Sequence, residues 1–176
     1  YGQKRSGITS PADGVPMGDT FDIDYVAHEL GHQFGGNHTF SHSAENNAVN
    51  VEPGSGSTIM GYAGITGATD VHAHSDDYFA YRSILQVQTN LAGKTCPVTT
   101  TLTNQAPVMS AGANYTIPKS TPFILTGSGT DPNGDTLSYC WEQNNDATTV
   151  GAAASYVSAT KTNGPNFRSL PPVSTP

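Results

Sequence analysis

The sequence predicts an α+β region in the first half of the chain, followed by an all-β module. Apolar residues recur at helical spacing in two segments before residue 92, whereas short runs rich in aromatic and β-branched residues follow Cys96. Hydrophobic residues make up 35% of the chain and charged residues 12%. The abundance of Gly, Ser, Thr, Asn and Pro favours loops and strands over a helical bundle.

Charge and hydropathy exclude two classes of partner. The net charge is −7 with 7 Lys plus Arg, and no basic cluster could neutralise a run of phosphates, so we expect no nucleic-acid binding. No apolar run approaches the roughly 20 residues that span a bilayer, so we expect no membrane span. The low Lys content favours a secreted protein, and the oligomeric state stays open with a monomer favoured.

The first predicted helix begins near residues 22–24, after a turn-rich loop. Asp19 or Thr20 could cap its N-terminus, and acidic residues in the first turn suit the positive end of the helix dipole. Gly35 and Gly36 end the apolar periodicity. We therefore expect the helix to stop there.

The second predicted helix covers about 75–91, and Gly93 would close it. After it the composition becomes Thr-rich and then contains a proline, which is typical of a domain boundary. We therefore expect an α+β region over residues 1–98, a linker over 99–105 and a β module over 106–176.

The β module is predicted from short strand-like runs at 115–117, 123–125 and 137–141, separated by Pro- and Gly-containing turns. This spacing resembles part of an immunoglobulin-like sandwich, as found in accessory modules of secreted bacterial enzymes. Cys96 and Cys140 could form one disulfide or remain two thiols. The sequence does not decide between these states.

Oxygen-bearing side chains alternate in one turn of the β module. They belong to Asp131, Asn133 and Asp135, with Gly134 for the bend. Such a pattern can hold calcium. A plain turn between strands explains the same residues and is the favoured interpretation.

The most informative stretch is HELGHQFGGNH, which contains His28, His32 and His38. Residues four apart lie one above the other on a helix, so His28 and His32 can reach one metal ion. A third ligand six residues later requires a sharp reversal of the chain. Gly35 stands where a positive φ angle would make that reversal and bring His38 to the metal.

Glu29 lies beside the predicted ligands without being needed as one. Three imidazoles leave a coordination position of zinc open for water, which is the arrangement of a catalytic site. A carboxylate next to that position can act as the general base and return the proton to the leaving amine. The sequence therefore predicts a zinc hydrolase with Glu29 as its base.

The same stretch resembles the long zinc signature of the metzincins, metallopeptidases with three His ligands and a downstream methionine turn. The segment STIMGY at 57–62 is similar to that turn, and this implies that Met60 packs beneath the metal as an apolar floor. Tyr62 follows at the position where some metzincins place a tyrosine. It could bind zinc weakly, donate a hydrogen bond to the reacting substrate or only pack.

Residues 9–96 look most like the reprolysin-like peptidases secreted by flavobacterial-type bacteria. Thr39 departs from the acidic residue that other metzincins carry after the third ligand. The resemblance implies the C-terminal portion of an α+β catalytic domain, with its active-site helix, Met-turn and C-terminal helix. Since only 27 residues precede His28, we expect the N-terminal sheet of that domain to be missing.

The function predicted from these observations is a zinc endopeptidase that acts on protein or peptide substrates. One alternative is a binding or adhesion module attached to an inactive peptidase fragment, but loss of Glu29 or of a ligand would be expected then. Another is a zinc deacetylase, against which the Gly-to-His spacing and Met60 both argue. The remaining histidines lack ligand spacing, and loop or surface roles are expected for them.

Overall fold

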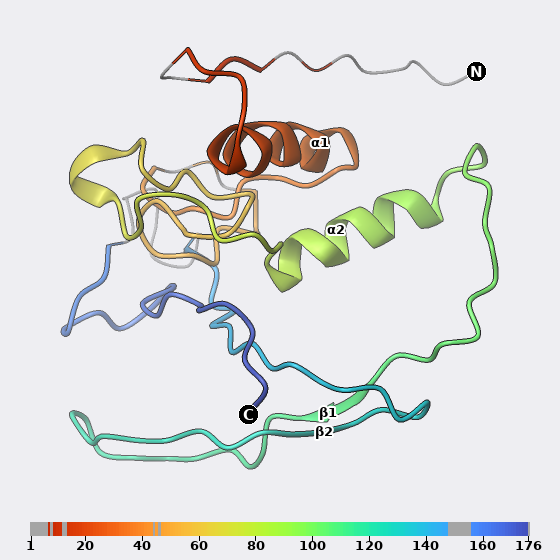
Figure 1. Ribbon diagram of the computed structural model, residues 1–176. Coiled ribbons are helices and arrows are strands. Elements are labelled where there is room, and N and C mark those ends of the chain that lie inside the picture. Colours follow the sequence, from red (N-terminus) through yellow and green to blue (C-terminus); the bar gives the residue numbers. More distant parts are fainter. Residues whose placement is uncertain are drawn as a thin grey trace. The chain divides into compact units, whose positions relative to one another are not determined.

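The computed structural model describes residues 7, 9–11, 14–43, 45, 47–147 and 156–175. Within these residues it is a small α+β structure with two α-helices and a two-stranded sheet (Figure 1). The chain divides into two compact units, of which the first comprises Tyr1–Pro97 with Trp141–Pro171 and the second Val98–Cys140 with Pro172–Pro176. No helix of the described part is long and apolar enough to cross a membrane.

The first helical segment carries the His motif. It starts as a π-helix, η1 at Thr20–Ala27, and continues as the α-helix α1 at His28–Gln33. Asp19, one of the two residues predicted to cap the helix, occupies the cap position, but its side chain makes no capping hydrogen bond. Asp24, a residue of the π-helix, forms a hydrogen bond outside the helix: its carboxylate accepts the backbone N–H of Ser75 at 2.8 Å.

Helix α1 ends at the predicted residues. The N–H of Gly36 donates to the carbonyl of Gly31 at 2.9 Å, and that of Gly35 donates to the carbonyl of His32 at 3.0 Å. Gly35 has a φ angle of 101°. These two bonds and the positive φ angle form a Schellman motif, which satisfies the last carbonyls of the helix and reverses the chain.

The core of the first unit is built from loops that follow this reversal. Residues 49–61 are all buried, and Met60 is 0% exposed. Backbone bonds join distant parts of these loops: Thr39 donates to Met60 at 3.1 Å, and Glu52 donates to Thr39 at 2.9 Å. A closely packed loop core of this kind keeps the residues after the motif against α1.

Helix α2 spans Tyr81–Ala92 and begins six residues later than the sequence predicts. The preceding backbone groups are bonded elsewhere: Asp76 donates to Ser57 at 2.7 Å, and Tyr78 accepts the N–H of Ile59 at 3.1 Å. Residues that make such contacts with another loop cannot complete helical turns. The helix ends at Gly93, as expected.

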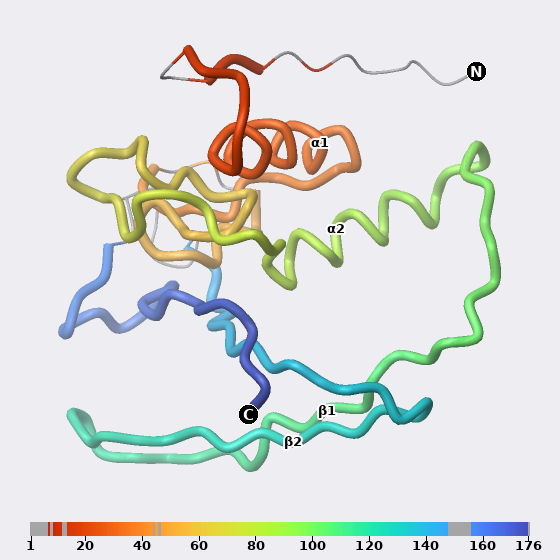
Figure 2. Tube along the Cα trace, viewed as in Figure 1, coloured from red at the N-terminus to blue at the C-terminus, as the bar shows by residue number. Residues whose placement is uncertain are grey.

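The second unit contains the sheet. Strands β1, Val108–Ser110, and β2, Ser128–Thr130, pair antiparallel with Val108 opposite Thr130, and Figure 2 shows the two segments running alongside each other. The runs predicted as strands lie outside them, and Tyr115 and Phe123 are 67% and 53% exposed. Only Tyr139 of these runs makes a bridge, with Val173.

The runs predicted as strands do not form a sheet. β-branched and aromatic side chains favour strands only where a second layer of the structure covers them. A two-stranded ladder provides no such layer, and the immunoglobulin-like sandwich stays a prediction. Trp141–Pro171, which the sequence assigned to the β module, clusters with the first unit. Cys96 is exposed and carries a free thiol.

Candidate metal centre

Three histidines converge at the C-terminal end of the motif helix. The Nε2 atom of His32 lies 3.1 Å from that of His28 and 3.0 Å from that of His38. His28 and His32 are one turn apart on α1, and the Schellman reversal brings His38 back to them. Among the described residues, this is the one group of His, Cys, Asp or Glu side chains placed to hold a metal ion.

Each of the three imidazoles is oriented from behind by an acceptor for its Nδ1. The acceptors are the carbonyl of Ile59 for His28 at 2.7 Å, the carbonyl of Gly36 for His32 at 2.8 Å and the carboxylate of Glu45 for His38 at 2.8 Å. A neutral imidazole has one N–H, so donation from Nδ1 leaves the Nε2 lone pair free. Partners of this kind fix the tautomer and orientation of metal-binding histidines.

The resulting donor set fits a divalent cation. The Nε2 atom of His32 lies 3.0 to 3.1 Å from the Nε2 atoms of His28 and His38, and lone pairs that face one another at such distances repel unless a cation lies between them. Nitrogen ligands about 2.0–2.1 Å from a tetrahedral zinc ion would be separated by roughly 3.4 Å. The observed separations therefore suit zinc with little adjustment.

Burial lowers the pKa of two of these imidazoles, those of His28 and His38. His28 is 5% exposed, and burial, together with the charges that His32 and His38 would carry, lowers its pKa to about 4. Burial also lowers the pKa of His38, although the hydrogen bond and charge of Glu45 act in the opposite direction. Neutral imidazoles at physiological pH are the form that binds a metal.

Met60 lies directly against the ligand helix. A β-carbon added to Gly31 would overlap the sulfur of Met60 and lie 3.1 Å from the ring of Phe79. The preceding residue, Ile59, supplies the carbonyl that orients His28. The turn at 57–62 thus packs against α1 through Met60 and provides the orienting acceptor for His28 through Ile59.

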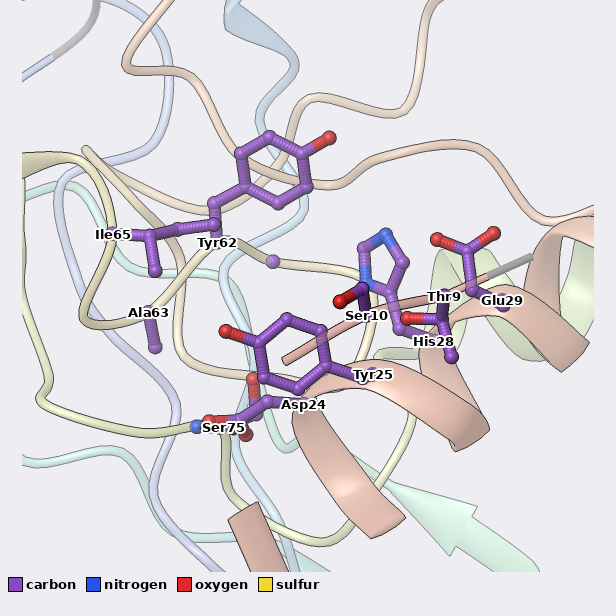
Figure 3. A pocket seen from close by; sticks show the side chains of 11 residues that line it. Thr9, Ser10, Asp24, Tyr25, His28, Glu29, Tyr62, Ala63, Ile65 and Ser75 are labelled. Carbon is purple, nitrogen blue, oxygen red and sulfur yellow. Dashed lines mark hydrogen bonds between the residues drawn. The ribbon is translucent and has the colours of Figure 1, made fainter. Parts of the chain in front are cut away.

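Glu29 and Tyr62 line a pocket of about 260 Å³ beside the triad (Figure 3). Glu29 is half-buried and comes from α1, as does His28, whereas Tyr62 follows the turn that contains Met60. The ring centroid of Tyr62 lies 4.5 Å from that of His38 and 5.6 Å from that of His28. A carboxylate and a phenol therefore line the same pocket as His28.

The phenol of Tyr62 keeps its proton at neutral pH. Burial raises its pKa, and the negative charges of Glu45 and Glu29 raise it further. A protonated phenol can donate a hydrogen bond to an oxygen that gains negative charge. Tyr62 is thus equipped as a donor toward the pocket.

The predicted calcium residues form a turn in the second unit. The Asp131 carboxylate accepts the backbone N–H groups of Asn133 at 2.8 Å and Asp135 at 3.1 Å, while Asn133 accepts that of Gln105 at 2.7 Å. Bonds from an Asp side chain to the backbone two residues on are typical of Asx-turns. The contacts favour the plain turn, and calcium stays a prediction.

Two carboxylates near the triad were missed by sequence reasoning. The carboxylate of Glu45 accepts a hydrogen bond from Nδ1 of His38, and the buried carboxylate of Glu52 accepts one from the hydroxyl of Thr39, the residue after His38. Neither residue has a fixed spacing from the motif on a helix or strand, because both reach their partners through irregular loops. The signal available for Glu52 was an acidic residue in a stretch otherwise rich in Gly, Ser and Asn.

Comparison with protein families gives one match. Residues 2–91 match the family described as metallo-peptidase family M12B, reprolysin-like. The comparisons with curated proteins and with solved structures found no match. The matched range is 90 residues of 176, and it contains the His triad, Glu29 and Met60. With its three converging imidazoles inside the matched region, this chain belongs to the reprolysin-like metallopeptidases of family M12B.

Proposed function

We propose that this chain is a secreted zinc endopeptidase that hydrolyses peptide bonds in protein substrates. The observation that carries the proposal is the convergence of three imidazole Nε2 atoms beside a pocket that a carboxylate and a phenol line. Membership of a metallopeptidase family supports zinc as the metal and proteins as the substrates. A low Lys content supports the extracellular setting.

In this proposal His28, His32 and His38 hold the zinc ion. Bound zinc supplies Lewis acidity, which polarises a carbonyl and makes water more acidic. Glu29 accepts the proton of the attacking water at its carboxylate and delivers it to the nitrogen of the leaving amine. Tyr62 donates its hydroxyl proton in a hydrogen bond to the substrate oxygen as negative charge develops there.

The pocket beside the triad would receive a substrate side chain. Tyr25, Ala63 and Ile65 contribute apolar surface to it, and Asp24 and Ser75 contribute polar atoms. Such a mixed lining of about 260 Å³ suits one side chain of moderate size. We propose that this pocket anchors the substrate next to the bond that is cut.

The proposal also includes the finer parts of the sequence prediction. The motif and the Met60 turn support a partial metzincin catalytic domain of the secreted bacterial reprolysin-like kind. The strand-like runs over 106–176 support an immunoglobulin-like accessory module, for which a spacing or anchoring role is proposed. A solution structure of 106–176 with two packed sheets would support the module, and one without them would contradict it.

The function is tested by metal analysis and proteolysis on the same preparation. Mass spectrometry under native conditions should find about one zinc per chain, and casein or gelatin should be cleaved unless a chelator is present. Zinc without cleavage would support the metal site and contradict an active peptidase in this chain. Absence of zinc after incubation with the metal would contradict the proposal as a whole.

A further inference from the structure

Glu52 is a buried carboxylate with four hydrogen-bond donors. It is 6% exposed. One oxygen accepts the backbone N–H groups of Ser57 at 2.8 Å and Thr58 at 3.0 Å, and the other accepts the hydroxyls of Thr58 at 2.6 Å and Thr39. A carboxylate offers about four acceptor positions. The four hydrogen bonds from the described loops therefore occupy all of these acceptor positions.

These bonds join the two loop segments on which the metal ligands depend. Thr39 directly follows the ligand His38 in the sequence. Thr58 directly precedes Ile59, whose carbonyl accepts from Nδ1 of His28. The carboxylate of Glu52 therefore connects the segment that carries one ligand with the turn that orients another.

The main chain strengthens the same connection. The N–H of Glu52 donates to the carbonyl of Thr39 at 2.9 Å, and the hydroxyl of Ser41 donates to the carbonyl of Glu52 at 2.6 Å. Gly56 allows the turn to close over the carboxylate, because a β-carbon there would lie 3.0 Å from Oε2 of Glu52. The backbone thus holds Glu52 beside the segment after His38, and its side chain reaches across to the turn.

We propose that Glu52 is a positioning residue for the metal centre. It does not contact the metal; it sets the separation between His38 and the turn that carries Ile59 and Met60. Charge-assisted hydrogen bonds are shorter and stronger than neutral ones, so a carboxylate holds this separation more firmly than a neutral side chain would. The inference rests on the proposed function, because it assumes that the triad binds a metal.

The test uses the full chain with Co²⁺ in place of zinc. The Glu52→Gln variant keeps the length of the side chain and one acceptor oxygen for the two N–H groups, but it turns an NH₂ group toward the threonine hydroxyls. Cobalt affinity, measured by competition with a chelator, should fall roughly tenfold, which is the usual effect of removing an orienting partner. The visible absorption bands of Co²⁺, which report ligand geometry, should also change.

Asp70→Asn is the matched control. Asp70 is a half-buried carboxylate of the same unit, and like Glu52 it accepts a backbone N–H and a threonine hydroxyl, both from Thr66, at 3.0 and 2.7 Å. This variant should keep the wild-type cobalt affinity and spectrum. Equal losses in the two variants would show a general effect of removing a carboxylate and would overturn the proposal.

Thr39→Val provides a second variant that removes a single hydroxyl. If Glu52 acts through Thr39, the double variant should bind cobalt no more weakly than Glu52→Gln alone, whereas independent effects would add. Additive losses, or wild-type spectra in both single variants, would overturn the inference while leaving the metal site intact. Failure of the wild-type chain to bind cobalt would instead overturn the proposed function, and this inference with it.

Discussion

In the proposed function, Glu29 is the residue at which proton transfer can be separated from metal binding. The three nitrogens placed to hold a metal belong to histidines, and Glu29 lines the pocket that His28 also lines. We expect Glu29→Gln to keep zinc and to lower kcat by at least about 10²-fold, the usual contribution of a general base. His32→Ala should lose the metal itself. Retained hydrolysis by Glu29→Gln would remove this residue from the proposed role.

Gly31 is the residue at which the ligand helix contacts Met60. Replacing a helical glycine with alanine normally stabilises a helix by about 1 kcal/mol. At Gly31 the new β-carbon would overlap the Met60 sulfur, and overpacking costs about 1–3 kcal/mol. We therefore expect Gly31→Ala to lower the free energy of unfolding, measured with urea.

Gly93→Ala is the control for this contact, because the nearest atom to a β-carbon there lies 3.7 Å away. That variant should be as stable as the wild type. Equal stability of the Gly31→Ala variant would contradict the close contact between α1 and Met60.

At the scale of elements, the end of α1 determines where the third ligand lies. Gly35 has a φ angle of 101°, and a β-carbon there would lie 2.9 Å from the Asn90 side chain. Gly35→Ala should destabilise the chain by about 1–2 kcal/mol because L-residues disfavour this conformation. Cobalt affinity should fall as well, since His38 follows the reversal.

Gly134→Ala introduces a comparable backbone strain in the second unit, where φ is 83° and no atom lies near the added carbon. It should leave cobalt affinity unchanged. A Gly35→Ala variant that binds cobalt as tightly as the wild type would contradict the role of the Schellman motif in placing His38.

The same elements show which features a sequence can predict. Spacing on a helix and a glycine at its end are local signals, and they sufficed for the convergence of His28 and His32 and for the stops at Gly35 and Gly93. The start of α2 depends on bonds from residues 76 and 78 to a distant loop. Local periodicity contains no information about such bonds, so the predicted start was wrong.

The orienting carboxylates were missed for the same physical reason. Glu52 lies 13 residues from Thr39 and 6 from Thr58, and its bonds exist only because irregular loops bring these residues together. The strand predictions failed because the β propensity of Tyr115 and Phe123 reflects burial that a two-stranded sheet does not provide. Long-range packing decided both outcomes.

At the scale of the whole molecule, metal binding and the order of the first unit should be linked. The loops between His38 and Met60 form the core of that unit, and two of the three triad histidines are oriented by backbone carbonyls, one of which lies in those loops. A ligand at 100 times its Kd stabilises the folded state by about 2.7 kcal/mol. For a chain of this size, its removal should lower Tm by roughly 5–10 °C.

Hydrogen exchange can locate this linkage along the chain. Chelation should increase amide exchange over residues 39–60, because the metal restrains His38 at one end and, through Ile59, the turn at the other. Amides of β1 and β2 should exchange at the same rate with and without metal, since their pairing lies in the second unit. An unchanged thermal transition, or equal changes in both units, would contradict a local coupling between metal and loop order.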